Sequence, residues 1–67
     1  MVCYVNNLPQ ETAKAQTLTQ LLAHLALAGQ RGLAVAVNDT VVPRAAWPRH
    51  VLRAHDRVTI IRAAQGG

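Results

Sequence analysis

The sequence predicts an α+β domain in which a mixed sheet of four to five strands packs on one helix. Leucines at helical spacing between Thr17 and Gly29 predict the helix. Runs rich in β-branched residues at 2–5, 33–37 and 58–62 predict strands on both sides of it. The chain has 67 residues, of which 51% are hydrophobic, and this suits a single domain with one compact core. Because helix and sheet each carry one apolar face, we expect them to pack as two layers.

The N-terminal residues predict a β-hairpin. Residues 2–5 read Val-Cys-Tyr-Val and suit a strand. Alternation places Cys3 on the same face as Val5, and we interpret this face as the core side. A buried cysteine behaves as a small hydrophobe, so Cys3 is interpreted as a core residue rather than a sulfur-handling nucleophile. Turn residues at 6–9 end in a proline, so the second strand, expected at 10–14, begins there or lies at a sheet edge.

The predicted helix has a start signal, an apolar stripe and a stop signal. Thr17 and Gln20 form a capping box, in which each side chain accepts a hydrogen bond from the backbone amide of the other residue. The stripe that faces the core consists of Leu18, Leu21, Leu22 and Leu25. Gly29 is well placed as the stop, because glycine readily takes the left-handed conformation of a helix C-terminal cap.

The segment after the helix predicts a second hairpin. Residues 33–37 alternate large and small side chains, which is typical of a strand with one face in the core. Asn38 and Asp39 suit a tight turn. The chain returns as a short strand at 40–42, which Pro43 ends.

The last third of the chain is expected to be irregular until its final strand. Residues 44–57 show no clear period and include a turn at 54–56. Residues 58–62 form the most β-prone run, which we expect to lie beside the first strand at the sheet centre. We therefore predict a folded domain over residues 1–62 and a flexible C-terminal tail over residues 63–67.

The side chains that usually carry catalysis or bind metals are scarce in this sequence. A single cysteine can form neither an intrachain disulfide nor a cysteine pair for a metal. His24, His50 and His55 do not have the spacing of zinc ligands, and no glycine-rich phosphate loop is present. Asp and Glu number only three, so a catalytic carboxylate pair is not expected. We therefore expect no catalytic residues, no metal site and no bound cofactor, and the chain is not expected to be an enzyme itself.

The sequence also predicts a cytoplasmic protein with no membrane partner. No stretch approaches the ~20 apolar residues that span a bilayer. The first residues have neither the basic start nor the apolar block of a signal peptide. Small secreted domains usually carry several disulfides, so a lone cysteine favours a reducing compartment.

The basic charge of the chain indicates an acidic partner. Seven Lys and Arg residues against three Asp and Glu give a net charge of +4, which attracts acidic protein surfaces or nucleic acid. Five arginines fall in the last third of the chain: Arg44, Arg49, Arg53, Arg57 and Arg62. Proteins that bind single-stranded RNA usually add aromatic stacking platforms, and the aromatic residues here are Tyr4 and Trp47 alone. We therefore favour solvated arginines around a protein-binding face over a nucleic-acid site.

Arg44 and Trp47, with the hydrophobic face of the sheet, are the candidate docking residues. An exposed tryptophan is a frequent anchor of protein interfaces. The alternative is that Trp47 covers the edge of the core. Sequence reasoning leaves both interpretations open.

Gln65, Gly66 and Gly67 form the candidate functional tail. Glycine has no Cβ, so a Gly-Gly end is thin enough to extend into a narrow channel of another protein. Five residues after the last strand reach roughly 17 Å when extended, which would bring the Gly67 carboxylate into a partner's active site. The alternative is an ordinary frayed chain end of small residues.

Several short segments carry a resemblance to a known family. They are Val5-Asn6-Asn7, Thr17-Leu18, Leu21-Leu22, Leu33 to Asn38, Val42-Pro43-Arg44 with Trp47, Asp56-Arg57-Val58 and Gln65-Gly66-Gly67. With these segments the chain resembles, over essentially its whole length, the ThiS family, the sulfur carriers of thiamin thiazole biosynthesis. The resemblance implies a ubiquitin-like β-grasp fold. The chain departs from the family pattern at Ala45 and Ala46, where relatives often have polar or acidic residues, and in its higher positive charge.

The resemblance also implies a reaction cycle centred on Gly67. A ThiF-type adenylating enzyme uses ATP and magnesium to convert the Gly67 carboxylate into an acyl-adenylate. Sulfur that comes from cysteine through a cysteine desulfurase displaces AMP and leaves a thiocarboxylate. A ThiG-type thiazole synthase then takes this sulfur. Gln65 and Gly66 would enter the partner's active site together with Gly67.

Two alternative functions stay open at this point. Molybdopterin-type sulfur carriers share the Gly-Gly end and the carrier chemistry but serve a different acceptor. A small RNA-binding β-grasp module similar to TGS domains would use the arginines and would not need the Gly-Gly end.

Overall fold

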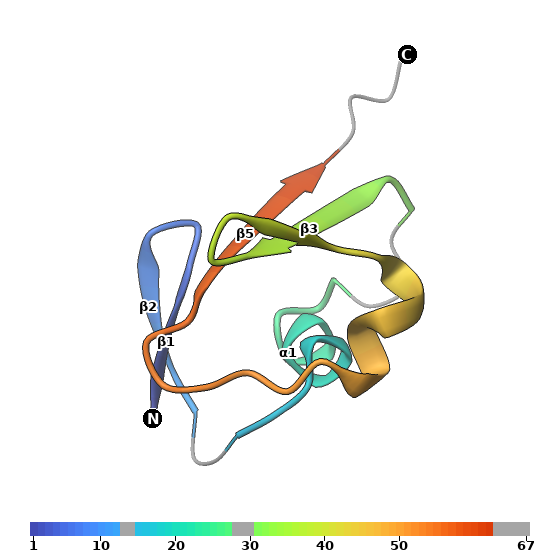
Figure 1. Ribbon diagram of the computed structural model, residues 1–67. Helices are drawn as coiled ribbons and strands as arrows, with labels where there is room; N and C mark the ends of the chain where they lie inside the picture. Colours follow the sequence, from blue (N-terminus) through green and yellow to red (C-terminus); the bar gives the residue numbers. More distant parts are fainter. Residues whose placement is uncertain (13–14, 28–30, 63–67) are drawn as a thin grey trace.

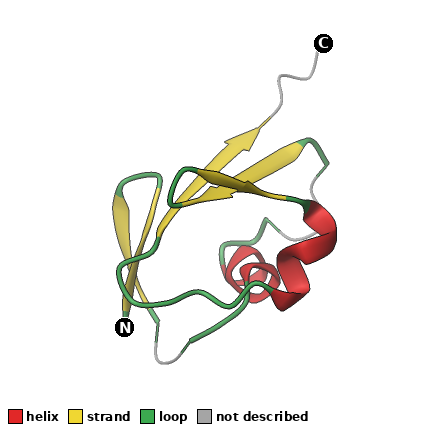
Figure 2. Ribbon diagram, viewed as in Figure 1, coloured by secondary structure: helices red, strands yellow, loops and turns green. Residues whose placement is uncertain are grey.

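The computed structural model of the protein describes residues 1–12, 15–27 and 31–62 (Figure 1). Its elements are, in order, β1 (Val2–Val5), β2 (Leu8–Glu11), α1 (Leu18–His24), β3 (Leu33–Val37), β4 (Thr40–Val42), the 3-10 helix η1 (Arg44–Arg49) and β5 (Arg57–Arg62). The helices lie on one side of a five-stranded sheet (Figure 2). The predicted α+β class, with a mixed sheet packed on one α-helix, is therefore confirmed.

The strands follow the order β2-β1-β5-β3-β4 across the sheet. β1 and β5 run parallel, with Tyr4 beside Arg57 and Val5 beside Val58. The other neighbouring strands are antiparallel. The last strand thus lies at the sheet centre beside the first, as predicted, and the arrangement is the ubiquitin-like β-grasp fold.

The helix α1 begins with the predicted capping box. The Gln20 amide donates to the Thr17 hydroxyl at 3.2 Å, and the Thr17 amide donates to the Gln20 side-chain oxygen at 2.8 Å. Both bonds satisfy amides that a helix N-terminus would otherwise leave free. The predicted stripe is buried at Leu18, Leu21 and Leu22 and partly buried at Leu25.

The helix ends at His24, well before the glycine at which it was predicted to stop, so that prediction is wrong. Ala26 takes the left-handed conformation, with φ 61°. Its amide donates to the carbonyl of Ala23 at 3.1 Å, and the Leu27 amide donates to the carbonyl of Leu22 at 2.8 Å. These two bonds form a Schellman motif, which satisfies the last carbonyls of the helix. An alanine therefore takes the position that usually belongs to glycine.

The second strand occupies Leu8–Glu11, so the predicted bounds of 10–14 are wrong. The connecting turn consists of Asn6 and Asn7 alone, with φ angles of 50° and 68°. Positive φ at both central residues is typical of a type I′ hairpin turn, in which asparagine is tolerated. Pro9 lies inside the strand because β2 is at the sheet edge, where a missing amide breaks no ladder.

The segment after β4 is more regular than predicted. η1 covers Arg44–Arg49 at the start of the segment expected to be irregular. Beyond it, Val51 forms an isolated antiparallel bridge with Thr17, and the Leu52 amide donates to the carbonyl of Gln16 at 2.8 Å. These contacts fix the segment against the start of α1.

The core lies between the sheet and the helices. Its buried hydrophobic residues are Cys3, Val5, Leu18, Leu21, Leu22, Val35, Val37, Val42, Trp47, Leu52 and Val58. The presence of Cys3 and Val5 in this set confirms the predicted core face of the first strand. In the part of the chain that is described, no helix combines the length and the apolar character that crossing a membrane requires.

Candidate functional site

The predicted functional tail, Gln65, Gly66 and Gly67, lies outside the described residues, as does the rest of the segment 63–67. The structure does place the residue from which this segment continues. β5 ends at Arg62, which pairs with the first residue of β3 (Figure 1). The candidate site is therefore built from β5 and the surfaces beside it.

β5 is held firmly along its length. It pairs in parallel with β1 and antiparallel with β3. The Ile60 amide donates to Oδ1 of Asn6 at 2.9 Å, and the Asn6 amide donates to the carbonyl of Val58 at 2.9 Å. The turn between β1 and β2 thus binds directly to β5. The strand that precedes the tail is a fixed part of the core rather than a loose end.

A polar network secures the start of β5. Asn38 Nδ2 donates to Oδ1 of Asp56 at 3.0 Å, and the Arg57 amide donates to Oδ1 of Asn38 at 2.9 Å. The Arg53 amide donates to Oδ2 of Asp56 at 2.8 Å, and Arg57 forms an ion pair with Asp39 at 3.3 Å. Both aspartates therefore act as turn residues, as predicted. Their oxygens are used to shape the backbone, which is a structural task.

The sheet face opposite α1, which we name the outer face, carries exposed apolar side chains together with the exposed Arg57 and Thr59 of β5. Tyr4 is 37% exposed, Ile61 57% and Val41 71%. The register places Ile61 beside Ala34, and Ala36 beside Val41, so apolar side chains continue from β5 across β3 to β4. Contiguous exposed apolar surface is typical of protein interaction sites.

Trp47 is buried, with an exposed fraction of 6%. Its indole N–H donates to the carbonyl of Val42 at 2.8 Å, and the Arg44 guanidinium carbon lies 5.0 Å from the centre of the ring. This distance allows a cation–π interaction. Of the two interpretations left open by the sequence, the structure agrees with a tryptophan that covers the core. The role of Arg44 and Trp47 in docking stays a prediction, in which Arg44 is the accessible member.

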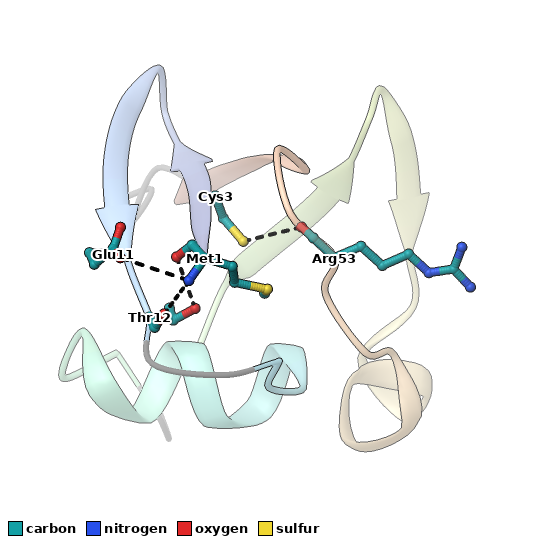
Figure 3. A network of polar contacts seen from close by, with 5 residues as sticks. All are labelled: Met1, Cys3, Glu11, Thr12 and Arg53. Atoms are coloured by element: carbon teal, nitrogen blue, oxygen red, sulfur yellow. Dashed lines mark hydrogen bonds and ion pairs between the residues drawn. The ribbon is translucent and has the colours of Figure 1, made fainter.

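Cys3 points into the core, where its Sγ lies 3.4 Å from the carbonyl oxygen of Arg53 (Figure 3). Burial raises the pKa of the Cys3 thiol, and the negative charge of Asp56 raises this pKa further, against a smaller lowering by the N-terminal ammonium. That ammonium, on Met1, donates to the carbonyl of Thr12 at 2.6 Å. A protonated, buried thiol is a poor nucleophile. The interpretation of Cys3 as a core residue is therefore confirmed.

The histidines form no cluster in the described ranges. His24 and His55 are exposed, on α1 and in the turn before β5 respectively. Within residues 1–12, 15–27 and 31–62, no group of three His, Cys, Asp or Glu side chains could hold a metal ion. The described residues thus offer exposed apolar side chains on the outer face and an anchored strand.

Comparison with known families and proteins agrees with this geometry. The ThiS family model matches residues 3–67. The sulfur carrier protein ThiS of Escherichia coli (strain K12) is 32% identical over 62 residues, which cover 92% of each chain. The match thus extends from β1 to the C-terminal glycines.

Two solved structures have the same fold. The crystal structure of the thiamine biosynthesis protein ThiS from Geobacter metallireducens superposes with a TM-score of 0.86 at 28% identity, over 100% of both chains. A solution structure of a thiamine biosynthesis protein from the same organism has a TM-score of 0.79 at 28% identity, over 100% of this chain and 88% of that one. The family match, the identity to a curated member and the shared fold agree, and this chain belongs to the ThiS family.

Proposed function

We propose that the chain is a sulfur carrier protein of thiamin thiazole biosynthesis, and that it works in the cytoplasm. Its Gly67 carboxylate is adenylated by a ThiF-type enzyme, becomes a thiocarboxylate and donates its sulfur to a ThiG-type thiazole synthase. The observation that carries the proposal is the ThiS family match, which extends over residues 3–67 and so includes the Gly-Gly end. The Escherichia coli relative named a sulfur carrier supports the same activity.

The chemistry explains why activation of Gly67 precedes sulfur transfer. A carboxylate is a poor acyl donor. In the first step a Gly67 oxygen forms a bond to the α-phosphorus of ATP, and pyrophosphate leaves. In the second step the outer sulfur of an enzyme persulfide, derived from cysteine through a desulfurase, attacks the acyl carbon, and the carbon–oxygen bond to AMP breaks. A second thiol then attacks the inner sulfur of the resulting acyl disulfide, so that a new disulfide forms and the Gly67 thiocarboxylate leaves. The adenylating enzyme binds ATP and magnesium, and it stabilises the charge that develops in both steps.

The carrier itself contributes position and recognition. It acts as a protein co-substrate rather than as an enzyme, and no catalytic group is required of it. β5 gives the tail a rigid base, because the Asn6 side chain and two neighbouring strands hold that strand. From this base, five residues reach roughly 17 Å, and Gly66 keeps the last part thin.

The outer face supports recognition by partner proteins. Its exposed apolar residues continue to Ile61, next to the end of β5. A protein interface usually has an apolar centre and a polar rim. A partner that covers this face would therefore meet the tail at its edge. Arg44, two residues after the edge strand β4, would then be a contact at the rim.

A loading experiment with a matched pair of variants tests the tail. The chain is incubated with its cognate ThiF-type enzyme, ATP, magnesium, a cysteine desulfurase with cysteine, and a thiol reductant, and its intact mass is measured. Gly66→Leu should block loading, because the added side chain cannot pass a narrow channel. Thr19→Leu, which adds a leucine on the exposed side of α1, is the control and should load as the wild-type chain does. Equal loading of Gly66→Leu would contradict the steric role of the diglycine.

The acceptor is tested separately from loading. The loaded chain is offered to a ThiG-type thiazole synthase and, in parallel, to the large subunit of a molybdopterin synthase. We expect sulfur transfer to the thiazole synthase only. Transfer to the molybdopterin enzyme alone would keep the carrier chemistry and overturn the assignment to thiamin.

A further inference from the structure

Three arginines lie at the end of the sheet from which the chain continues into residues 63–67. Arg62 ends β5 and pairs with Leu33 at the start of β3, and Arg31 comes shortly before that strand. β4 runs antiparallel to β3, so it ends toward the same end of the sheet (Figure 1). Arg44 begins η1 two residues after the end of β4. All three residues are exposed. We name Arg31, Arg44 and Arg62 the tail-end arginines.

The carboxylate side chains of the chain lie elsewhere. Asp39 is in the turn between β3 and β4, and Asp56 directly precedes β5, so both are at the opposite end of the sheet. Glu11 ends β2 and pairs with Val2 at the start of β1. Because β1 runs parallel to β5, this position is also remote from the end of β5. These are the three acidic residues of the sequence, so none of its carboxylate side chains lies among the tail-end arginines.

Positive side chains thus gather at one end of the sheet, while the acidic side chains lie away from that end. We call this separation the polarity of charge. An isolated pair of exposed charges at 4 Å gains only about 1 kcal/mol in water. Several charges of one sign on one surface nevertheless act together, since they steer an oppositely charged partner during its approach. The tail-end arginines therefore present positive charge to the protein that receives the tail.

We propose that the tail-end arginines bind an acidic rim of Asp and Glu side chains around the opening in the partner protein that receives residues 63–67. The proposal rests on the carrier function proposed above, because that function places the tail inside a partner. A protein fits better than a nucleic acid, since Ile61, an exposed apolar residue of the outer face, directly precedes Arg62 at the end of β5. Strand alternation places the Arg62 side chain on the other face of the same strand end. An apolar centre bordered by charged residues is typical of a protein interface. Trp47, in contrast, is buried and offers no platform for stacking bases.

Association kinetics of the full chain with its cognate ThiF-type enzyme test the proposal. The double variant Arg31→Gln/Arg62→Gln is compared with Arg49→Gln/Arg53→Gln, and each lowers the net charge of +4 by two. Arg44 is left in place because it packs over Trp47. At low NaCl the tail-end variant should associate about tenfold more slowly and lose most of its salt dependence, since rim charges act mainly on the association rate. The control variant should stay within about twofold of the wild-type rate.

Three results would overturn the proposal. The first is an equal effect of the two double variants on association, which would reflect net charge alone. The second is loss of binding to a fluorescent oligouridine RNA by the tail-end variant with unchanged association to the enzyme, which would assign the arginines to nucleic acid. The third is a wild-type chain that the enzyme never loads with sulfur, which would also remove the carrier function. If the wild-type chain is loaded normally and the two variants associate at the same rate, the acidic-rim proposal is overturned but the carrier function is not.

Discussion

Asn6 links the β1–β2 turn to the strand that precedes the tail. Its backbone is left-handed, with φ 50°, and its Oδ1 accepts a hydrogen bond from the Ile60 amide at 2.9 Å. Glycine can take the same backbone conformation without steric cost but has no side chain. Substitution by glycine therefore separates the contribution of the hydrogen bond from that of the turn.

We expect Asn6→Gly to lower the free energy of unfolding by about 1 kcal/mol, because the Ile60 amide loses its partner. Asn7→Gly is the control, since Asn7 shares the left-handed backbone with φ 68° in the same turn. Urea denaturation of both variants measures the difference. Hydrogen exchange at the Ile60 amide should become faster in Asn6→Gly only. Equal stability and equal exchange in the two variants would show that the bond does not anchor β5.

Cys3 gives the stability of the domain a pH dependence in the alkaline range. Its folded-state pKa is raised, first by burial and then by Asp56. The folded state therefore holds the thiol proton more tightly than the unfolded state. By linkage, this stabilisation is fully present below the pKa of the unfolded thiol, about 8.5, and is lost as the pH rises through the folded-state value. The stability of the wild-type chain should thus decline above about pH 8.5.

The Cys3→Ala variant isolates this effect. It should be less stable than the wild-type chain at neutral pH, because a buried side chain becomes smaller. Its stability should nevertheless decline less on going to alkaline pH, since it has no thiol to ionise. Urea denaturation at a neutral and an alkaline pH measures both quantities. An identical alkaline decline in the two proteins would contradict the assigned role of the thiol.

Some residue roles follow from local sequence and others do not. The Thr17–Gln20 capping box needs only neighbouring residues. Strand alternation groups Cys3 with Val5, and the interpretation of that face as the core side is confirmed. The position of Trp47 depends on η1 and on the Val42 carbonyl, which tertiary structure brings to its indole. Sequence reasoning therefore had to leave Trp47 between two interpretations.

Among the elements, α1 carries the least expected feature, a C-terminal cap made by Ala26 at φ 61°. An alanine in this conformation costs roughly 1 kcal/mol or more, which glycine avoids. Ala26→Gly should therefore stabilise the domain by about 1 kcal/mol. Ala23→Gly, inside the same helix, should destabilise it by about 0.5–1 kcal/mol. Thermal denaturation distinguishes the two, and destabilisation by both would contradict the Schellman cap.

The bounds of an element were predictable where its sequence shows clear alternation and a clear turn. The strands at 33–37 and 40–42 alternate cleanly and meet at a turn pair, and the structure has the same bounds. The bounds of β2 were missed because Pro9 suggested a longer turn, whereas the sheet edge accommodates proline inside the strand. η1 was missed because a short 3-10 helix has no hydrophobic period of its own.

The whole molecule combines an anchored strand, an apolar outer face and a polarity of charge. The fold was predictable because the resemblance to the ThiS family extends along the chain and the structural match covers all of it. The polarity was not predictable, because Arg31, Arg44 and Arg62 are far apart in sequence. Only the β3–β5 register and the antiparallel course of β4 bring them to one end of the sheet.

The central claim is that the whole domain presents one atom group, the Gly67 carboxylate, for activation and sulfur loading. Top-down mass spectrometry tests it most directly, after incubation with the cognate ThiF-type enzyme, ATP, magnesium and a sulfur source. We predict a mass gain equal to the exchange of one oxygen for sulfur, confined to the C-terminal fragment that contains Gly67. An unchanged mass with an enzyme of verified activity, or sulfur found on Cys3 instead, would contradict the claim.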